Sequence, residues 1–178
     1  MQGISVRPET SEDLRAIDVV HLSAFEGDQE VGLVSALRRA PDFDPELSLV
    51  AEFHGRIVGH VLLTRALLKR GQDTLEVAVL APMAVVPSQS HRGIGSALLA
   101  AAEERARERG FAAIVEVGQP EFYRRFGFRP ASDWELRCNL PVEQEMMTAK
   151  ELQPGRLAGG GLVLYPSEFL QLFERGAA

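Results

Sequence analysis

The stretch that decides the fold is VAVLAPMAVVPSQSHRGIGSALLAAAEERARERGFAAIVEV, residues 77–117. A valine-rich run, Val77–Val86, leads into the glycine-containing turn PSQSHRGIGS. Strong helix formers follow and end at Gly110, and a second apolar run, FAAIVEV, closes the segment. This order of strand, helix and strand predicts a βαβ unit with parallel strands and a right-handed crossover.

The flanking residues predict further strands and helices. Apolar residues at helical spacing predict one helix after an N-cap at Thr10 or Ser11 and a second over Asp28–Arg39. The remaining apolar runs predict strands at Ile4–Arg7, in a hairpin over Leu47–Leu63 that turns at His54-Gly55-Arg56, and at Trp134–Leu140 and Leu162–Tyr165. The last two strands are separated by a polar, turn-rich stretch. The fold class predicted is α/β with a mixed sheet.

The composition is that of a globular protein with one domain: 178 residues, 46% hydrophobic and 25% charged. The net charge of -6 argues against nucleic acid or an anionic membrane as a partner, because both require a basic surface. The chain shows neither a signal-peptide pattern nor a long apolar run, so we expect no membrane span. A single cysteine, Cys138, excludes an intramolecular disulfide, and no Cys/His spacing is typical of a zinc site. We therefore expect a cytoplasmic protein without a metal.

The turn SHRGIG, residues 90–95, has the composition of an anion-binding loop. Its glycines let the backbone approach a ligand, and the first N–H groups of the following helix favour a phosphate. Arg92 adds a charge-assisted donor. A tight connection that binds nothing would have the same sequence. The Walker string is absent, and the dinucleotide fingerprint fails at Leu98, so a Rossmann domain is the weaker interpretation.

Two successive segments resemble a known family. LAPMAVVPSQSHRGIGSALLAAAEERARERGF is similar to the acetyl-CoA motif of the GNAT superfamily of N-acetyltransferases, and PEFYRRFGFRPAS is similar to the motif that follows it. LSLVAEFHGRIVGHVLL, EVGLVSALR and ELQPGRLAGGGLVLYP extend the resemblance to the YhbS-like subgroup. The resemblance implies a mixed, mostly antiparallel sheet with a central parallel βαβ unit flanked by helices. We expect a GNAT core over residues 1–138 and a C-terminal extension over 139–178, packed on the same domain.

The resemblance implies an N-acetyltransferase that uses acetyl-CoA as cosubstrate and acetylates a primary amine of a small molecule or a protein. It places the CoA site on a strand backbone and on the glycine loop, at Met83, Ala84, Val85, Val86, Ser90, His91, Arg92, Gly93, Ile94, Gly95 and Ser96. Pro82 fits this site, because a proline within a strand interrupts pairing and leaves backbone groups for the pantetheine arm. Ser90 departs from the Gln or Arg of the family and has a shorter reach. Gln89 or Arg92 could compensate.

Direct acetyl transfer to an amine needs a base, a donor for the oxyanion and an acid for the departing thiolate. Tyr123 falls on the position of the family's acid, although it could also be a packed aromatic among the neighbouring phenylalanines. Glu116 and Glu76 are candidate bases, although each could be a solvated or paired surface group. His60 lies within the apolar strand segment IVGHVLL. This position is more typical of a hydrogen-bonded core histidine than of a catalytic residue.

Two other functions are open at this stage. A non-catalytic acyl-CoA-binding module is suggested by Ser90 and by the uncertain base. A dinucleotide-binding oxidoreductase would require NAD(P) binding, against which the mismatch at Leu98 argues. The late glycine-rich segment and strand could close a homodimer or complete the sheet.

Overall fold

The structure is a computed structural model that describes residues 3–174. The helices are α1 (Leu14–Ala24), α2 (Gln29–Arg38), α3 (Ile94–Glu108), α4 (Pro120–Arg124) and α5 (Gln171–Glu174). The strands are β1 (Ile4–Pro8), β2 (Ser48–Phe53), β3 (Arg56–Arg70), β4 (Asp73–Val85), β5 (Ala113–Val117), β6 (Arg129–Pro130), β7 (Leu136–Cys138), β8 (Met147–Glu151) and β9 (Gly161–Leu164). None of the helices described is long and apolar enough to cross a membrane.

The chain forms two compact units. Unit 1 contains the residues up to Thr64 together with Pro82–Arg105, and unit 2 contains Arg65–Ala81 together with the residues from Ala106 onward. The strands β3 and β4 and the helix α3 each contribute residues to both units.

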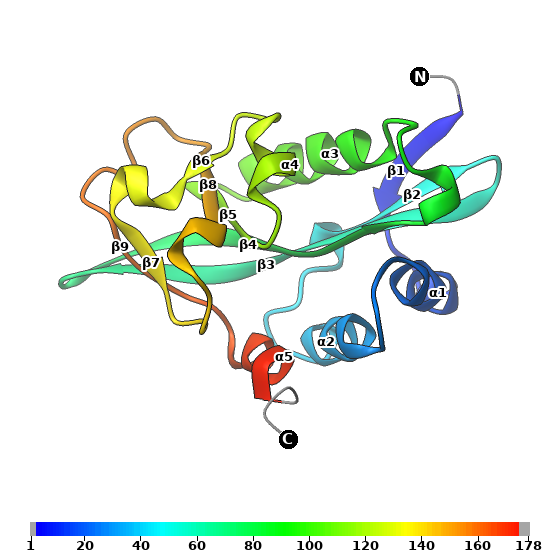
Figure 1. Ribbon diagram of the computed structural model, residues 1–178, viewed down its shortest axis with the longest axis horizontal. Helices are drawn as coiled ribbons and strands as arrows, with labels where there is room; N and C mark the ends of the chain where they lie inside the picture. The colour runs from blue at the N-terminus through cyan, green and yellow to red at the C-terminus, as the bar shows by residue number, and fades with distance from the viewer. Residues whose placement is uncertain (1–2, 175–178) are drawn as a thin grey trace. The chain divides into compact units, whose positions relative to one another are not determined.

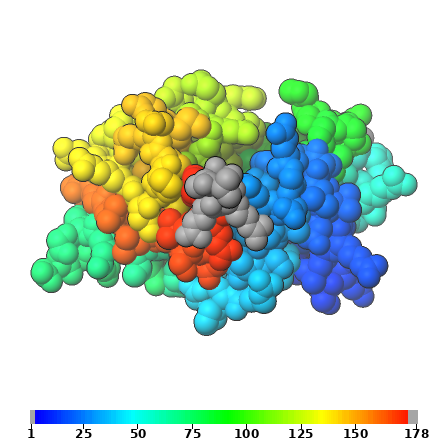
Figure 2. Space-filling model, turned by 60° about the horizontal axis from the view of Figure 1, so that its bottom comes forward, coloured from blue at the N-terminus to red at the C-terminus, as the bar shows by residue number. Residues whose placement is uncertain are grey.

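Unit 1 is built on the antiparallel strands β1, β2 and the first part of β3. The predicted hairpin is confirmed: β2 and β3 meet at Phe53 and Arg56, and the two turn residues, His54 and Gly55, both have positive φ. Positive φ at both positions is the requirement of a two-residue type I′ turn. Helix α3 lies on one side of these strands, and α1 and α2 lie on the other (Figure 1). The same two helices form an outer face of unit 1 (Figure 2). Val19, on α1, is 61% exposed.

A close approach at Gly59 joins α3 to β3. A Cβ atom at this position would lie 2.9 Å from Leu98 Cδ1, 3.0 Å from Ile94 Cγ2 and 3.2 Å from the carbonyl oxygen of Ala84. Leu98 and Ile94 are fully buried. The missing side chain of Gly59 therefore lets the first turns of α3 pack directly on the backbone of β3.

Unit 2 contains the predicted parallel pair. β4 pairs in parallel with β5, through Ala78 with Ile114 and Val79 with Val115. Because α3 connects these strands along the chain, the predicted βαβ unit is confirmed. The antiparallel pairs of unit 2 are β5 with β8, β8 with β6 and β9 with β3, and β7 pairs in parallel with β9. The mixed, mostly antiparallel sheet flanked by helices is the fold class that the sequence predicts.

The C-terminus of α3 is fixed by a Schellman motif. Gly110 has a φ of 75°, and its N–H donates to the carbonyl of Arg107, while the N–H of Phe111 donates to the carbonyl of Ala106. Glycine takes this left-handed conformation without steric cost, as expected for the residue that ends the helix.

The structure corrects the sequence-based assignment at three places. The N-cap of α1 is Asp13 rather than Thr10 or Ser11. The strand predicted at Trp134–Leu140 is reduced to β7, because a 3₁₀ turn occupies Ala131–Trp134 and Glu135 has a positive φ. The stretch predicted to be turn-rich contains β8, whose charged residues fall at its C-terminal end and hide the buried Met147, Thr148 and Ala149.

We predict that Gly59→Ala lowers the free energy of unfolding by about 1–3 kcal/mol, because the added methyl overpacks the contact with α3. Gly32→Ala, in α2, is the matched control, because nothing lies within 4 Å of its added Cβ. That change should raise the stability by roughly 0.5–1 kcal/mol through helix propensity. Urea unfolding followed by circular dichroism measures both. A Gly59→Ala protein as stable as the wild type would contradict the proposed close approach.

Candidate functional site

The parallel pairing of β4 with β5 ends at Val79 and Val115, before the predicted cosubstrate segment begins. Within unit 1, the N–H of Val86 donates to the carbonyl of Val58 on β3 at 2.8 Å, so this donor is already occupied. Neighbouring residues of a strand direct their backbone groups to opposite edges. Of the predicted backbone positions, Met83 and Val85 therefore direct their polar groups away from β3.

The glycine loop bends sharply before α3. After a 3₁₀ turn at Pro87–Gln89, His91 and Gly93 take positive φ values of 66° and 80°. The helix begins at Ile94, within the segment that the sequence assigns to the turn, so Gly95 and Ser96 lie in its first turn. The N–H groups of Ile94, Gly95 and Ser96 have no acceptor within the helix, because the first turn of any helix leaves its donors unpaired. These donors and the helix dipole form an arrangement that can bind a phosphate.

The side chains of the loop contribute less to an anion site than its backbone. Ser90, His91 and Arg92 are exposed, and the guanidinium of Arg92 lies 5.7 Å from the centre of the Phe53 ring. Gln89 turns its Oε1 inward, where this atom is buried and makes no hydrogen bond within the described chain. Of the two side chains expected to compensate for Ser90, Arg92 is exposed and Gln89 is half-buried, and their role stays a prediction.

Glu116, on β5, is a buried carboxylate in unit 2, with 4% of its surface exposed. It accepts hydrogen bonds from the N–H of Gln119 and from Thr148 Oγ1, both at 3.1 Å. Gly118 leaves it room, since a Cβ there would approach Glu116 Oε1 to 3.1 Å. Burial raises the pKa of Glu116 to about 7, against the opposing effect of the two hydrogen bonds. This carboxyl can therefore take and release a proton near neutral pH.

Glu76, the other candidate base, has a different environment. Its side chain is about half exposed on β4, and its carboxylate forms an ion pair with Arg65. An exposed, paired carboxylate is typical of a solvated surface. The structure thus separates the two glutamates that the sequence leaves equivalent.

Tyr123, on α4, is buried with its ring against Phe122 and Phe128, at centroid distances of 5.1 and 5.3 Å. Burial raises the pKa of its phenol above the usual value, and the charge of Glu116 raises it further. The side chain is therefore both a packed aromatic and a phenol that keeps its proton at neutral pH. Both predicted catalytic residues belong to unit 2, and the charge of Glu116 acts on the phenol of Tyr123.

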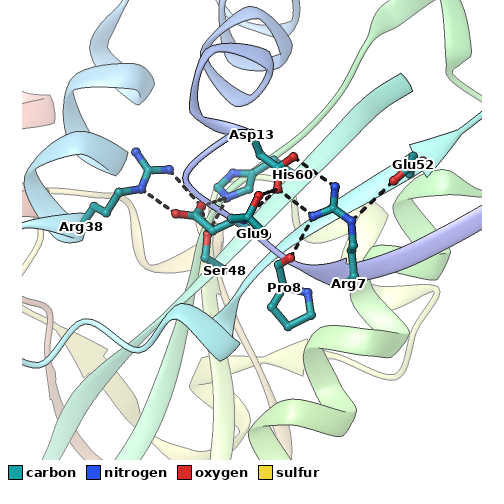
Figure 3. Close-up of polar contacts among 9 residues, drawn as sticks. Arg7, Pro8, Glu9, Asp13, Arg38, Ser48, Glu52 and His60 are labelled. Atoms are coloured by element: carbon teal, nitrogen blue, oxygen red, sulfur yellow. Dashed lines mark hydrogen bonds and ion pairs between the residues drawn. The ribbon is translucent and has the colours of Figure 1, made fainter. Parts of the chain in front are cut away.

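His60, on β3, lies in a buried hydrogen-bonded network of unit 1 (Figure 3). Its Nε2 is 2.8 Å from Ser48 Oγ, and its Nδ1 is 2.8 Å from His21 Nε2. Ser48 Oγ donates to Glu9, which also accepts two hydrogen bonds from Arg38, at 2.7 and 2.9 Å. Through Glu9, which directly follows β1, the network links the end of that strand with β2, β3, α1 and α2.

Proton counting fixes the tautomers of this network. The proton of Ser48 is committed to Glu9, so His60 donates from Nε2 and accepts at Nδ1 from the Nε2–H of His21. Burial lowers the pKa of His60, and it lowers the pKa of His21 to about 3. Burial alone would raise the pKa of Glu9, but hydrogen bonds from His60, Arg38 and Ser48 outweigh it and hold this pKa at about 2. The result is two neutral histidines beside an ionised, paired carboxylate, which supports the interpretation of His60 as a core residue.

We predict that acid destabilises the protein through this network. The unfolded chain binds protons at histidine below its usual pKa of about 6.5, whereas folded His21 does so only near its pKa of about 3. The stability that neutral His21 contributes is therefore present above pH 6.5 and is lost as the pH falls towards 3. At pH 5, the free energy of unfolding should be lower than at pH 7 by about 2 kcal/mol from this residue.

Urea titrations between pH 5 and 7 measure this slope. His21→Gln keeps a donor for His60 but does not titrate, so the slope should become shallower. His54→Asn is the matched control, because His54 is exposed and asparagine tolerates its positive φ. A His21→Gln protein with the wild-type slope would refute the assignment.

Sequence reasoning missed two buried polar groups of unit 2. Thr148 lies on β8, which the sequence does not predict, although the alternation within MTAKE is a weak strand signal. Tyr165 follows β9, and its buried hydroxyl makes no hydrogen bond within the described residues. No local pattern marks this hydroxyl, since its lack of a partner depends on residues distant in sequence.

The comparisons with known proteins agree with this fold. The sequence model of the acetyltransferase (GNAT) family matches residues 15–128. Two Escherichia coli (strain K12) proteins named as uncharacterized N-acetyltransferases are similar over most of their length. YjhQ is 34% identical over 153 residues, which cover 83% of this chain and 84% of YjhQ. YhbS is 33% identical over 166 residues, which cover 92% of this chain and 97% of YhbS.

Solved structures give the same result. The GNAT family N-acetyltransferase YhbS from Escherichia coli, in complex with CoA, superimposes with a TM-score of 0.85 at 31% identity, covering 94% of this chain and 92% of that one. A GNAT family acetyltransferase from Brucella melitensis, in complex with acetyl-CoA, gives a TM-score of 0.75 at 26% identity, covering 95% and 99%. The chain belongs to the GNAT family of acetyltransferases, and the predicted family and YhbS-like subgroup are confirmed.

Proposed function

We propose that the protein is an acetyl-CoA-dependent N-acetyltransferase that transfers the acetyl group directly to a primary amine of a small molecule or a protein. The observation that carries this proposal is the pair of buried groups in unit 2, Glu116 and Tyr123. One titrates near neutral pH and the other keeps its proton. Buried groups with such opposed proton affinities are typical of acid–base catalysis. The relatives described in complex with CoA and acetyl-CoA support the cosubstrate.

Unit 1 would bind the cosubstrate mainly through its backbone. The N–H groups at the start of α3 and in the loop from His91 to Gly93 would hold the pyrophosphate. The N–H of Ser90 already donates to the carbonyl of Pro87 at 3.1 Å. The free backbone edge of Met83 and Val85 would bind the pantetheine arm as an added strand. Ala84 and Val86 would shape this edge rather than donate to the arm, because the N–H of Val86 already bonds to Val58.

Unit 2 would move the protons, with acetyl-CoA supplying an activated thioester. Glu116, ionised, would accept a proton from the amine directly or through a water molecule as the nitrogen bonds to the acetyl carbon. Tyr123 would hold a proton for the sulfur that departs. The net charge of -6 favours cationic amines as acceptors through long-range attraction. The cytoplasmic location, the absence of a nucleic-acid partner, the homodimer and the boundary at residue 138 stay predictions.

The first experiment is calorimetric binding of acetyl-CoA, CoA and NADH to the purified chain at matched salt concentration. Binding of both CoA species without NADH, followed by release of free thiol with at least one amine of a broad panel, is the expected result. Binding of acetyl-CoA without turnover of any amine would favour the non-catalytic module. Binding of NADH alone would favour the oxidoreductase, and the proposal would then fail.

We predict that Tyr123→Phe slows acetyl transfer by roughly 10²–10⁴-fold, because the leaving sulfur loses its proton donor. The dissociation constant of acetyl-CoA should not change. Steady-state kinetics and calorimetry measure the two quantities. Phe122→Leu is the matched control, since it alters the same aromatic contact and keeps the hydroxyl. An unchanged rate in Tyr123→Phe would assign the residue to packing alone.

We predict that kcat/KM rises with pH through a pKa of about 7, because Glu116 accepts a proton only when ionised. The pH profile of kcat/KM is measured with two acceptors whose amines differ in pKa, which separates the titration of Glu116 from that of the amine. The rising limb of the profile that Glu116 causes stays near pH 7 with both acceptors, whereas the limb that the amine causes moves with the pKa of the amine. Glu116→Gln should remove the limb near pH 7 and most of the activity. Glu76→Gln tests the other candidate, and loss of the limb in that variant would make Glu76 the base.

A further inference from the structure

A cavity of about 330 Å³ lies within unit 2, between the end of the β3–β4 hairpin and the loop over residues 153–160. Its polar lining comes from Arg70, Asp73 and Thr74 on the two strands and from Arg156 on the loop. All of these except the half-buried Arg70 are exposed, so a solute can reach them. The volume is at the small end of the range for ligand sites, and none of these residues belongs to the proposed acetyl-transfer site.

The guanidinium of Arg70 is held in a fixed orientation by the loop. Its Nε donates to the carbonyl of Gly160 at 3.0 Å, its Nη1 to that of Ala158 at 2.8 Å and its Nη2 to that of Arg156 at 2.7 Å. These bonds use three of its five N–H donors, and carbonyl groups orient a guanidinium without neutralising it. Among the described residues, no carboxylate forms an ion pair with Arg70.

The loop itself is held by hydrogen bonds on both of its polar sides. The N–H of Gly155 donates to Glu151 Oε2 at 2.9 Å, and the N–H of Leu157 donates to Glu151 Oε1 at 3.0 Å. Glu151 thus binds N–H groups of the loop, while Arg70 binds its carbonyl groups. The backbone that carries Arg156 is therefore in place before any ligand arrives, which lowers the entropic cost of binding.

The cavity carries charges of both signs. The guanidinium of Arg156 is exposed and makes no hydrogen bond or ion pair within the part of the chain that the structure describes. A guanidinium in this state favours a carboxylate, whose two oxygens match its parallel N–H groups. Asp73 lines the same cavity and would repel a simple anion. A ligand with a carboxylate and an adjacent cationic group satisfies both conditions.

We propose that this cavity binds a small α-amino acid, with its carboxylate on Arg70 and Arg156 and its ammonium group on Asp73. Each charge of the ligand then has an opposite charge beside it, and the hydroxyl of Thr74 offers a further hydrogen bond to either group. The inference goes beyond the proposed function, because it adds a second ligand site and does not require acetyl-CoA.

The test is a titration of the ¹⁵N-labelled full chain, without acetyl-CoA, followed by ¹H–¹⁵N correlation spectra. The probes are L-alanine, propionate, which lacks the ammonium group, and L-alaninamide, which lacks the carboxylate. L-alanine should cause saturable shifts of the backbone signals of Thr74, Gly155 and Arg156. The other two probes should bind at least about tenfold more weakly, because each leaves one charge of the cavity unpaired.

Arg156→Gln should weaken the binding of L-alanine by roughly tenfold or more, because the carboxylate loses a charge-assisted donor. The melting temperature should not change, since the guanidinium makes no contact of this kind within the described chain. Arg137→Gln is the matched control: it removes the same charge from an exposed residue of β7 that does not line the cavity, and binding should stay unchanged.

Asp73→Asn gives a second readout that a structural role would not produce. This change removes the partner of the ammonium group and also the repulsion of a carboxylate. The binding of L-alanine should therefore weaken, while that of propionate should strengthen.

Three outcomes would overturn the inference. In the first, L-alanine causes no saturable shifts around the cavity, or only shifts elsewhere in the chain. In the second, Arg156→Gln binds L-alanine as tightly as the wild type does. In the third, inorganic phosphate binds more tightly than L-alanine, which would make the cavity a general anion site. A failure of amine acetylation would overturn the proposed function alone, because this titration contains no acetyl-CoA.

Discussion

The packing of α3 on β3 at Gly59 is the contact on which the geometry of unit 1 depends. An added Cβ would meet two side chains of α3 and the backbone of Ala84 at once. Next to it, the carbonyl of Val58 accepts the N–H of Val86 and so fixes the point where β4 ends and the glycine loop begins. The loop then has only a few residues in which to reach α3, and this is why His91 and Gly93 take positive φ. The unpaired N–H groups at the start of α3 gain their fixed direction from this packing.

The two units bury polar groups in opposite ways. In unit 1, the chain from His21 through His60 and Ser48 to Glu9 assigns every proton to an acceptor, and Arg38 balances the charge of the carboxylate. A hydrogen-bonded network of this kind rigidifies a core, and within the described residues only its outermost ring nitrogen, His21 Nδ1, makes no hydrogen bond. In unit 2, the two hydrogen bonds to Glu116 come from neutral donors. Its charge is poorly compensated and its pKa rises, which a structural role would not require but a base near neutral pH does.

The same contrast distinguishes His60 from Tyr165. Both side chains are buried, and both carry a group that can donate or accept a proton. His60 has a partner at each ring nitrogen, whereas the hydroxyl of Tyr165 has none within the described residues. Whether a buried polar group has a partner is thus decided by its environment and not by its residue type.

The sequence by itself determined the βαβ unit, the hairpin at His54-Gly55 and the glycine loop, because each depends on local propensities and spacings that neighbouring residues encode. It also supplied the family through the motifs around Gly93 and Tyr123. It did not predict β8, because the charged end of that strand conceals a short buried pattern. Only the tertiary structure distinguished Glu116 from Glu76 and showed that the hydroxyl of Tyr165 makes no hydrogen bond with the residues that the structure describes. Burial and hydrogen bonding at these positions are set by β7, β8 and β9, which lie far along the chain, and desolvation is a property of that assembled environment rather than of any local sequence.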